Sequence, residues 1–314
     1  MSYYQIEHGD GTNFQKEITN MLHGFGDNPN PNAATVVLVE SIVLQQLRGM
    51  LQEGLISSNM RGAKGITNYD IIYLMRKNPI KLKRLHDYQI KLDNIDKCRS
   101  MGSAPAADVS GFLLDDEKDP TIKKKRTHIE VIKELDETDE VNQITFDTID
   151  YLRKVRASKL TESMSFDKYE AYHKARCVSF RTGLGLGAQN KGYAKLERWL
   201  NPVKELKISW SALEVLCFLA YETVADLVDG VYLIRQDSKR RSGDQFSKLE
   251  GGYFCNPLSL NNAVYIKSGY EGVAPITVAE IREVLRRHFT PRKGLNGMFY
   301  RNMSMDLPGR FIAI

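Results

Sequence analysis

Apolar residues recur every three or four positions along two long, proline-free stretches of the chain. In the first stretch, from residue 33 to about 60, one helical face carries Val36, Val39, Val43, Leu47 and Met50. The second stretch, from residue 209 to about 241, has a stripe of similar length that includes Leu213, Leu216, Ala220, Val224, Leu227, Val228 and Val231. Each stretch predicts one amphipathic helix, roughly 40 Å long for about 28 residues.

Shorter helical segments flank each long one. A short segment with one apolar face precedes each long stretch, and a capped helix follows it. The caps are Thr67 with Asp70 three positions later in the first half, and Thr277 with Glu280 in the second. The order short, very long, short is therefore predicted twice.

The same pattern divides the chain into segments. We predict a first helical unit at 13–96 that ends in an extra helix, a charged and partly disordered linker at 97–160, the first and long helices of a second unit at 161–241, a loop at 242–275, and the third helix with a C-terminal tail at 276–314. Within the linker, residues 144–155 are predicted to be a helix whose docking place the sequence does not show.

A long helix with apolar residues on more than one face cannot bury them inside its own three-helix unit. The two units are therefore predicted to pack on each other. A linker of about sixty residues can span a domain, and linkage raises the local concentration of one unit around the other. An unrelated helical bundle is the alternative that periodicity leaves open.

Composition narrows the classes of function. A net charge of +5 is small for a protein that must neutralise many phosphates, so DNA wrapping is not indicated. The four cysteines are scattered, the six histidines lie in no metal-binding pattern, and no catalytic constellation is visible. We therefore expect no enzyme activity, no metal, no cofactor and no small-molecule substrate. The polar N-terminus and the short apolar runs indicate no secretory signal and no membrane span.

Several separate segments carry a family resemblance. They are FQKEITNMLHGFGDNPNP at 14–31, LVESIVLQQLRGML at 38–51, RGAKGITNYDIIYLMRKNPIKLKRL at 61–85, ARCVSF at 175–180, AKLERWL at 194–200, LAYETVADLVDGVYLIRQD at 219–237 and ITVAEIREVLRRH at 276–288. In this order they resemble the suppressor-of-Ty three family, the histone-fold-pair subunit of the SAGA coactivator complex.

The resemblance implies an all-α fold in which two histone folds pair within one chain as a pseudo-heterodimer. It also implies a nuclear, non-catalytic coactivator subunit that recruits or positions the TATA-binding protein at RNA polymerase II promoters. Its expected partners are that protein and other histone-fold and core subunits of SAGA, with weak direct DNA contact or none. The alternative is a histone-like protein that binds DNA directly.

The resemblance also implies an ion pair between Arg61 and Asp70 that ties a loop to the third helix. The alternative is that Arg61 is solvated and Asp70 only caps the helix. In the second unit, the loop at 242–275 offers no obvious equivalent arginine. The run Lys123, Lys124, Lys125 and Arg126 resembles a nuclear import signal, or is a solvated stretch of the linker.

Three acidic residues recur on the second long helix. Glu222, Asp226 and Asp229 are spaced by four and then three positions, so they lie near one face. They are either a solvated helix edge or a recognition stripe for a basic partner. The resemblance implies the TATA-binding protein as that partner, with Glu222 as the first candidate contact.

Overall fold

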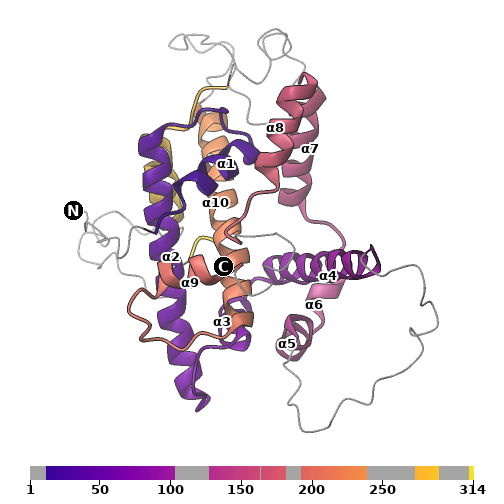
Figure 1. Cartoon of the computed structure of the whole chain (residues 1–314), viewed down its shortest axis with the longest axis vertical. Coiled ribbons are helices and arrows are strands. Elements are labelled where there is room, and N and C mark those ends of the chain that lie inside the picture. Colours follow the sequence, from indigo (N-terminus) through magenta and orange to yellow (C-terminus); the bar gives the residue numbers. More distant parts are fainter. Residues whose placement is uncertain (1–11, 103–126, 163, 182–191, 239–272, 290–310) are drawn as a thin grey trace.

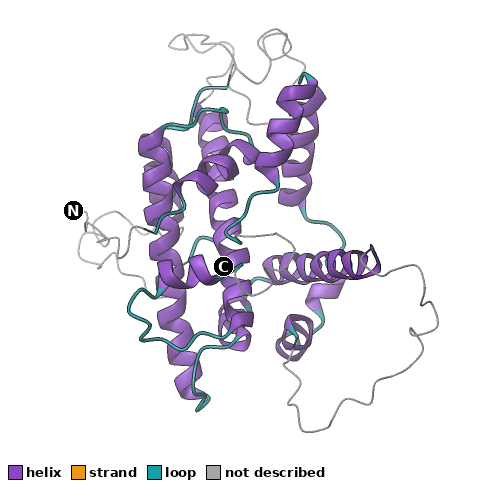
Figure 2. Ribbon diagram, in the orientation of Figure 1, coloured by secondary structure: helices purple, strands orange, loops and turns teal. Residues whose placement is uncertain are grey.

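The computed structural model describes residues 12–102, 127–162, 164–181, 192–238, 273–289 and 311–314. These residues form helices joined by loops and turns, and their one β-type contact is an isolated bridge between Ile66 and Ile208 (Figure 2). The prediction of an all-α fold is therefore confirmed for the described part of the chain.

The first half contains α1 (Gln15–Phe25), α2 (Ala33–Met60), α3 (Asn68–Met75) and α4 (Pro79–Gly102). Gly26 closes α1 with a φ of 116°, a conformation that favours glycine. Asn32 begins α2, and its side chain accepts a hydrogen bond from the Ala34 amide. At α3 the predicted cap is present, because Thr67 and Asp70 form a reciprocal capping box.

The second half contains α8 (Phe166–Arg176), α9 (Ala194–Leu200), α10 (Trp210–Ser238) and α12 (Val278–Phe289). The second predicted cap is also confirmed. The Thr277 amide donates to Glu280 Oε2 over 2.8 Å, and the Glu280 amide donates to Thr277 Oγ1 over 3.3 Å. Both halves thus follow their long helix with a helix that starts at a Thr-x-x-acid box.

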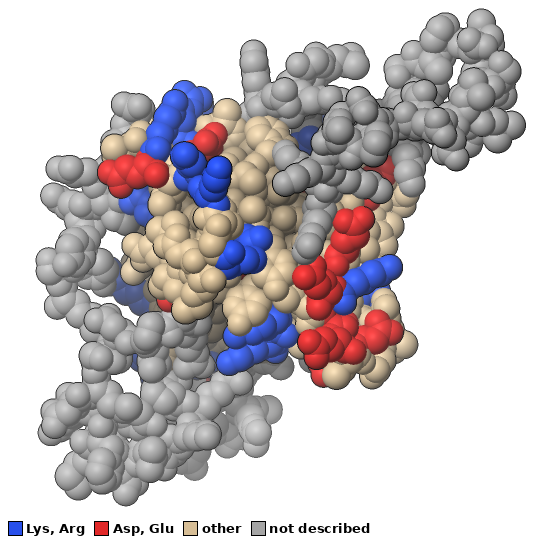
Figure 3. All heavy atoms as spheres, turned by 90° about the horizontal axis from the view of Figure 1, so that it is seen from below, with Lys and Arg blue, Asp and Glu red and all other residues tan. Residues whose placement is uncertain are grey.

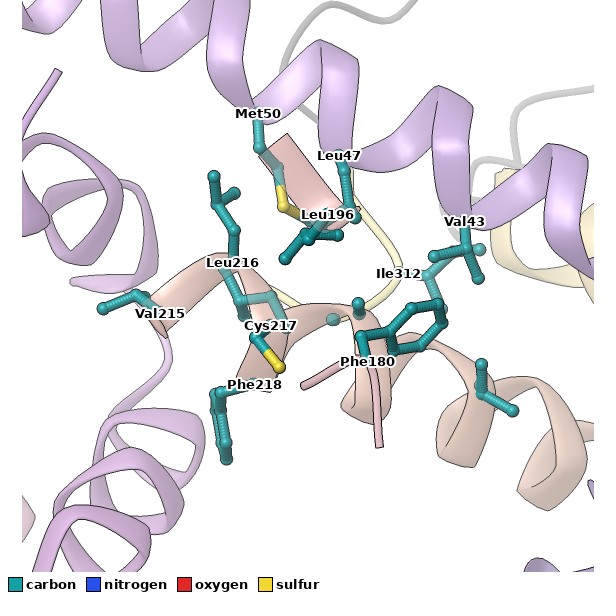
Figure 4. Packing of buried hydrophobic residues seen from close by; sticks show 14 of the residues in the cluster. Val43, Leu47, Met50, Phe180, Leu196, Val215, Leu216, Cys217, Phe218 and Ile312 are labelled. Atoms are coloured by element: carbon teal, nitrogen blue, oxygen red, sulfur yellow. The ribbon is translucent and has the colours of Figure 1, made fainter. Parts of the chain in front are cut away.

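The two long helices, α2 with 28 residues and α10 with 29, run side by side in Figure 1 and contact each other. One continuous apolar core contains buried residues from both halves. In Figure 4, Leu47 and Met50 of α2 lie near Leu196 of α9 and Leu216 of α10. All four are almost completely buried. Burying a leucine side chain contributes about 1.5–3 kcal/mol, so this shared core is the main source of stability.

Loops from opposite halves meet at both ends of the long helices. At one end, the Ile66 amide before α3 donates to the Lys207 carbonyl before α10 over 2.8 Å. At the other end, the Ile276 amide before α12 donates to Asp27 Oδ1 over 2.9 Å, and Thr35 Oγ1 donates to the Ile276 carbonyl over 2.7 Å. Each half therefore supplies backbone partners to the other.

Length and apolar content would also allow α2 to cross a membrane. In the fold, 56% of its most apolar window is buried inside the chain. Core helices of soluble proteins have this character, and the packing of α2 against α10 accounts for its apolar surface.

The segment predicted as a charged linker at 97–160 is largely structured where it is described. It contains α5 (His128–Leu135), α6 (Glu140–Gln143) and most of α7 (Thr148–Glu162), and its first residues extend α4. The helix predicted at 144–155 overlaps α7, whereas α5 and α6 were not predicted. They form because Val131, Ile132 and Val141 are buried in the core cluster. Residues 103–126 of this segment lie outside the described residues, and the partial disorder predicted for 97–160 stays a prediction there.

Candidate functional site: a buried ion-pair network beside a cleft

The three acidic residues predicted to share a face of the second long helix do so. Glu222, Asp226 and Asp229 of α10 all point toward α4 and α7, where they meet basic side chains. Glu222 is the most deeply placed, with its side chain only 6% exposed. The face they share is therefore an internal contact between helices.

Helix α4 supplies two of the cations from positions three residues apart. Lys81 Nζ lies 2.8 Å from Glu222 Oε2 and 2.7 Å from Asp226 Oδ2. Arg84 Nη1 lies 2.8 Å from Glu222 Oε2, and the rest of its guanidinium pairs with Asp147 just before α7. Arg84 therefore links α10 to the beginning of α7.

Helix α7 supplies the other two cations, again three residues apart. Arg153 reaches all three carboxylates of α10, at 3.1 Å from Glu222, 2.8 Å from Asp226 and 2.6 Å from Asp229. Arg156 also pairs with Asp229, and its guanidinium lies 4.3 Å from the ring centroid of Tyr232. Four cations thus face four carboxylates, counting Asp147, and the network is balanced in charge.

Burial and charge pull on these groups in opposite directions. Burial alone would raise the pKa of Glu222, but the charges of Lys81, Arg153 and Arg84 outweigh it and lower the pKa to about 2. For Asp226, burial is the larger effect and raises the pKa despite Lys81. For Arg153, burial lowers the pKa of the guanidinium, but the charges of Glu222, Asp229 and Asp226 outweigh burial and raise it. Glu222 is therefore held firmly as a carboxylate.

In this fold these residues form neither a solvated helix edge nor an exposed stripe, and a role for them in binding an external partner stays a prediction. Their basic partners belong to the same chain, and Glu222 has almost no exposed surface. One sequence signal could have indicated intrachain ion pairs with the acidic stripe. Basic residues recur three positions apart in two other segments, Lys81 with Arg84 and Arg153 with Arg156.

A cleft of about 730 Å³ opens beside the network, between α4, the beginning of α7, α10 and the segment that follows α8. Its apolar wall includes Tyr88 and Phe218, whose ring centroids are 5.4 Å apart. Its charged residues have both signs. They are Lys83, Arg84, Asp87, Lys91, Asp147, Asp150, Lys154, Arg176 and Glu222. The cleft therefore has no dominant charge that would select a ligand.

The ion pair implied between Arg61 and Asp70 is present. Arg61 Nη2 lies 2.7 Å from Asp70 Oδ2 and 2.9 Å from Thr67 Oγ1. The Asp70 side chain is fully buried and also caps α3 by accepting from the Thr67 amide over 2.8 Å. The pair therefore ties the end of α2 to the start of α3, and Asp70 performs both roles.

The second half has an equivalent pair that sequence analysis missed. Arg235 Nε lies 2.6 Å from Glu280 Oε1, and Arg235 Nη2 donates to the Pro275 carbonyl over 3.2 Å. The loop at 242–275 contains no arginine, and the equivalent residue lies inside α10, three residues before the helix ends. The two pairs share one sequence feature: in each, the acidic partner (Asp70 or Glu280) is also the acidic residue of a capping box.

Other predicted features lie elsewhere. The run Lys123, Lys124, Lys125 and Arg126 falls outside the described residues. Within the described ranges, no group of three or more His, Cys, Asp or Glu side chains could hold a metal ion. Cys217 is buried, and burial raises the pKa of its thiol to about 12, so it is a packing residue.

Comparison with known proteins adds three results. Residues 12–101, which include α1 to α3 and nearly all of α4, match the family described as Transcription initiation factor IID, 18kD subunit. A protein of Drosophila melanogaster named SAGA complex subunit Spt3 is 27% identical over 304 residues, covering 95% of this chain and 73% of that protein. A protein of the same name from Schizosaccharomyces pombe is 25% identical over 91% of this chain and 93% of its own length.

A shorter relative matches a smaller part of the chain. Transcription initiation factor TFIID subunit 13 of Arabidopsis thaliana is 33% identical over 88 residues, which cover 28% of this chain and 68% of that protein. The similarity thus has two levels, one over about a quarter of the chain and one over more than nine-tenths of it.

Proposed function

Since the chain belongs to the histone-fold family that contains SAGA complex subunit Spt3 and the 18-kDa subunit of TFIID, we propose that it is a coactivator subunit of a SAGA-type complex in the nucleus. In this proposal it recruits or positions the TATA-binding protein at RNA polymerase II promoters, and its work is binding without catalysis. The observation that carries the proposal is the similarity to two proteins named SAGA complex subunit Spt3 along more than nine-tenths of the chain.

The fold supports a binding role. Each long helix covers the other, so their apolar stripes are used inside the fold. The buried network then fixes α4 and α7 at defined positions on α10. A rigid set of outer faces is what a subunit needs if it is to hold partners in a fixed relation.

Affinity purification followed by a titration tests the proposal. The full chain, tagged and purified from nuclear extract, is expected to bring SAGA subunits with it, as identified by mass spectrometry. The purified complex is then titrated with the TATA-binding protein, and a complex lacking the chain is expected to bind it more weakly. Recovery of no SAGA subunit, or equal affinity with and without the chain, would contradict the proposal.

Direct DNA binding is the second candidate, and one observation favours it. Lys64, Lys204 and Lys207 are exposed beside the bridge between Ile66 and Ile208, so both halves place lysines at one end of the molecule. Figure 3 views the molecule from this side and shows basic side chains over the middle of the face. Because three lysines can contact only a few phosphates and the net charge of the chain is only +5, we expect its binding to DNA to be weak. A steep salt dependence with nanomolar affinity at physiological salt would favour this candidate instead.

A further inference from the structure

Three large apolar side chains are exposed together where the chain enters α7. Phe146 is 61% exposed, Ile149 47% and Tyr151 51%, and the ring centroids of Phe146 and Tyr151 are 5.3 Å apart. The same helix buries Ala157 and Leu160 on another face and directs Arg153 into the ion-pair network. These three side chains are therefore not part of the contacts that hold α7 in place, and no described part of the chain covers them.

The chain immediately before this group is strongly acidic. Residues 127–150 hold eight carboxylates and one lysine, a net charge of −7 with His128 neutral, in a chain whose net charge is +5. Glu137, Asp139 and Glu140 are exposed and make no ion pair with a described cation. Figure 3 shows acidic side chains gathered on the side of the molecule where α5 and α6 lie in Figure 1.

From this arrangement we infer that residues 130–151 form a docking surface, here called the acidic–aromatic surface, for a lysine- and arginine-rich segment of a partner protein that carries an apolar anchor. The aromatic pair receives the anchor, because aromatic side chains supply much of the binding energy at protein interfaces. The carboxylates attract the cations and speed the encounter. Glu140 lies within six residues of Phe146, a span of at most about 22 Å that a short peptide can bridge.

Two other exposed features do not select a partner in the same way. On α8, Phe166 and Tyr169 are also exposed, but their neighbours Asp167, Lys168 and Glu170 have mixed charge. The cleft beside the ion-pair network also has charges of both signs. The acidic–aromatic surface, by contrast, combines an apolar group with one dominant charge, and that negative charge repels nucleic acid.

Fluorescence anisotropy with the full chain tests the inference. The probe is a synthetic peptide of alternating lysine and arginine with one central phenylalanine, and a second peptide has glycine in place of that phenylalanine. We expect the first peptide to bind more tightly, and both to bind less tightly as salt is raised. The double variant Phe146→Ser with Tyr151→Ser should weaken binding of the first peptide about tenfold or more. Glu137→Lys with Glu140→Lys should weaken both peptides about tenfold.

Matched variants on α8, Phe166→Ser and Glu170→Lys, change an exposed aromatic and an exposed acid elsewhere and should leave the affinity unchanged. Circular dichroism checks that every variant keeps its helices. Unchanged affinity in both double variants would overturn the inference. Binding that appears only after Lys123–Arg126 are neutralised would also overturn it, because the surface would then belong to the chain's own basic run.

Discussion

The paired core and the arm that projects from it are held by different forces. The core consists of α2, α3, α10 and α12, and the arm consists of α4, α5, α6 and α7 within residues 79–102 and 127–162 (Figure 1). In the core, side chains such as Leu47 and Leu216 are completely buried against apolar neighbours. The arm also buries Leu82 and Leu85 and packs Tyr88 against Phe218 of α10, but α4 and α7 in addition meet α10 through the ion-pair network.

This difference has an energetic meaning. Apolar burial is non-directional, is not screened by salt as ion pairs are, and scales with area. A buried ion-pair network gives little net stability, because desolvation offsets the Coulomb attraction, but it leaves costly unpaired charge when one member is lost. The core therefore supplies most of the stability of the fold. The network determines where the arm lies, and with it the position of the acidic–aromatic surface.

Charge reversal at the centre of the network should have the largest effect. Glu222→Lys leaves Lys81, Arg84 and Arg153 without their shared carboxylate, and we expect it to destabilise the attachment of the arm by about 3–5 kcal/mol. Hydrogen exchange should show lost protection in α4 and α7 while α2 stays protected. Glu170→Lys, in an exposed pair on α8, is the control and should resemble the wild type. Retained protection in α7 would show that charge does not hold the arm.

Truncation in the core should act globally. Leu216 is fully buried between the halves, so Leu216→Ala is expected to lower the free energy of unfolding by about 2–5 kcal/mol. Urea denaturation of the whole chain measures this, and both halves should lose stability together. Leu233→Ala, on an exposed position of the same helix, is the matched control. If only one half unfolds earlier, the halves do not share a core.

The ion pairs Arg61–Asp70 and Arg235–Glu280 should contribute different amounts to the free energy of unfolding. The Arg235 side chain is 8% exposed and that of Arg61 is 40% exposed, although each pairs with the acid of a capping box. Arg235→Ala is expected to cost about 1.5–3 kcal/mol, as for a buried hydrogen bond to a charged group. Arg61→Ala should cost about 0.2–1 kcal/mol, because solvent screens an exposed pair. Thermal unfolding of the two variants in the same buffer compares them, and equal losses would refute the ranking.

Acid should loosen the arm before the core. The pKa of Glu222 is lowered to about 2 from a usual value of 4.5, so its stabilising contribution is complete above pH 4.5 and is lost as the pH falls toward 2. The raised pKa of Asp226 makes its protonated form more favourable as the pH falls, so it reduces the loss of stability that Glu222 causes. Hydrogen exchange of α7 across this range should show increasing opening, and Glu222→Gln should flatten the dependence. An arm equally protected at pH 5 and pH 2.5 would contradict this.

Features that depend on residues close together in the sequence could be predicted. The apolar stripes of α2 and α10 and the boxes at Thr67 and Thr277 depend on residues a few positions apart, and each is confirmed. The network could not be found in this way, because Lys81 and Glu222 are 141 residues apart and only the fold brings them together. An acidic stripe on a helix looks the same in sequence whether its cations come from a partner or from the chain itself. Arg235 was missed for a related reason, since it pairs from inside a helix and not from the loop.

The most direct test of the pairing separates the halves at residue 163 and measures each fragment alone and then mixed. Because each long helix needs the other to cover its apolar stripe, fragments 1–162 and 164–314 should each lack a cooperative unfolding transition. Mixed in equal amounts, they should form a one-to-one complex that regains the circular dichroism of the whole chain and unfolds in a single transition. A fragment that folds cooperatively alone, with the stability of the intact chain, would contradict a shared core.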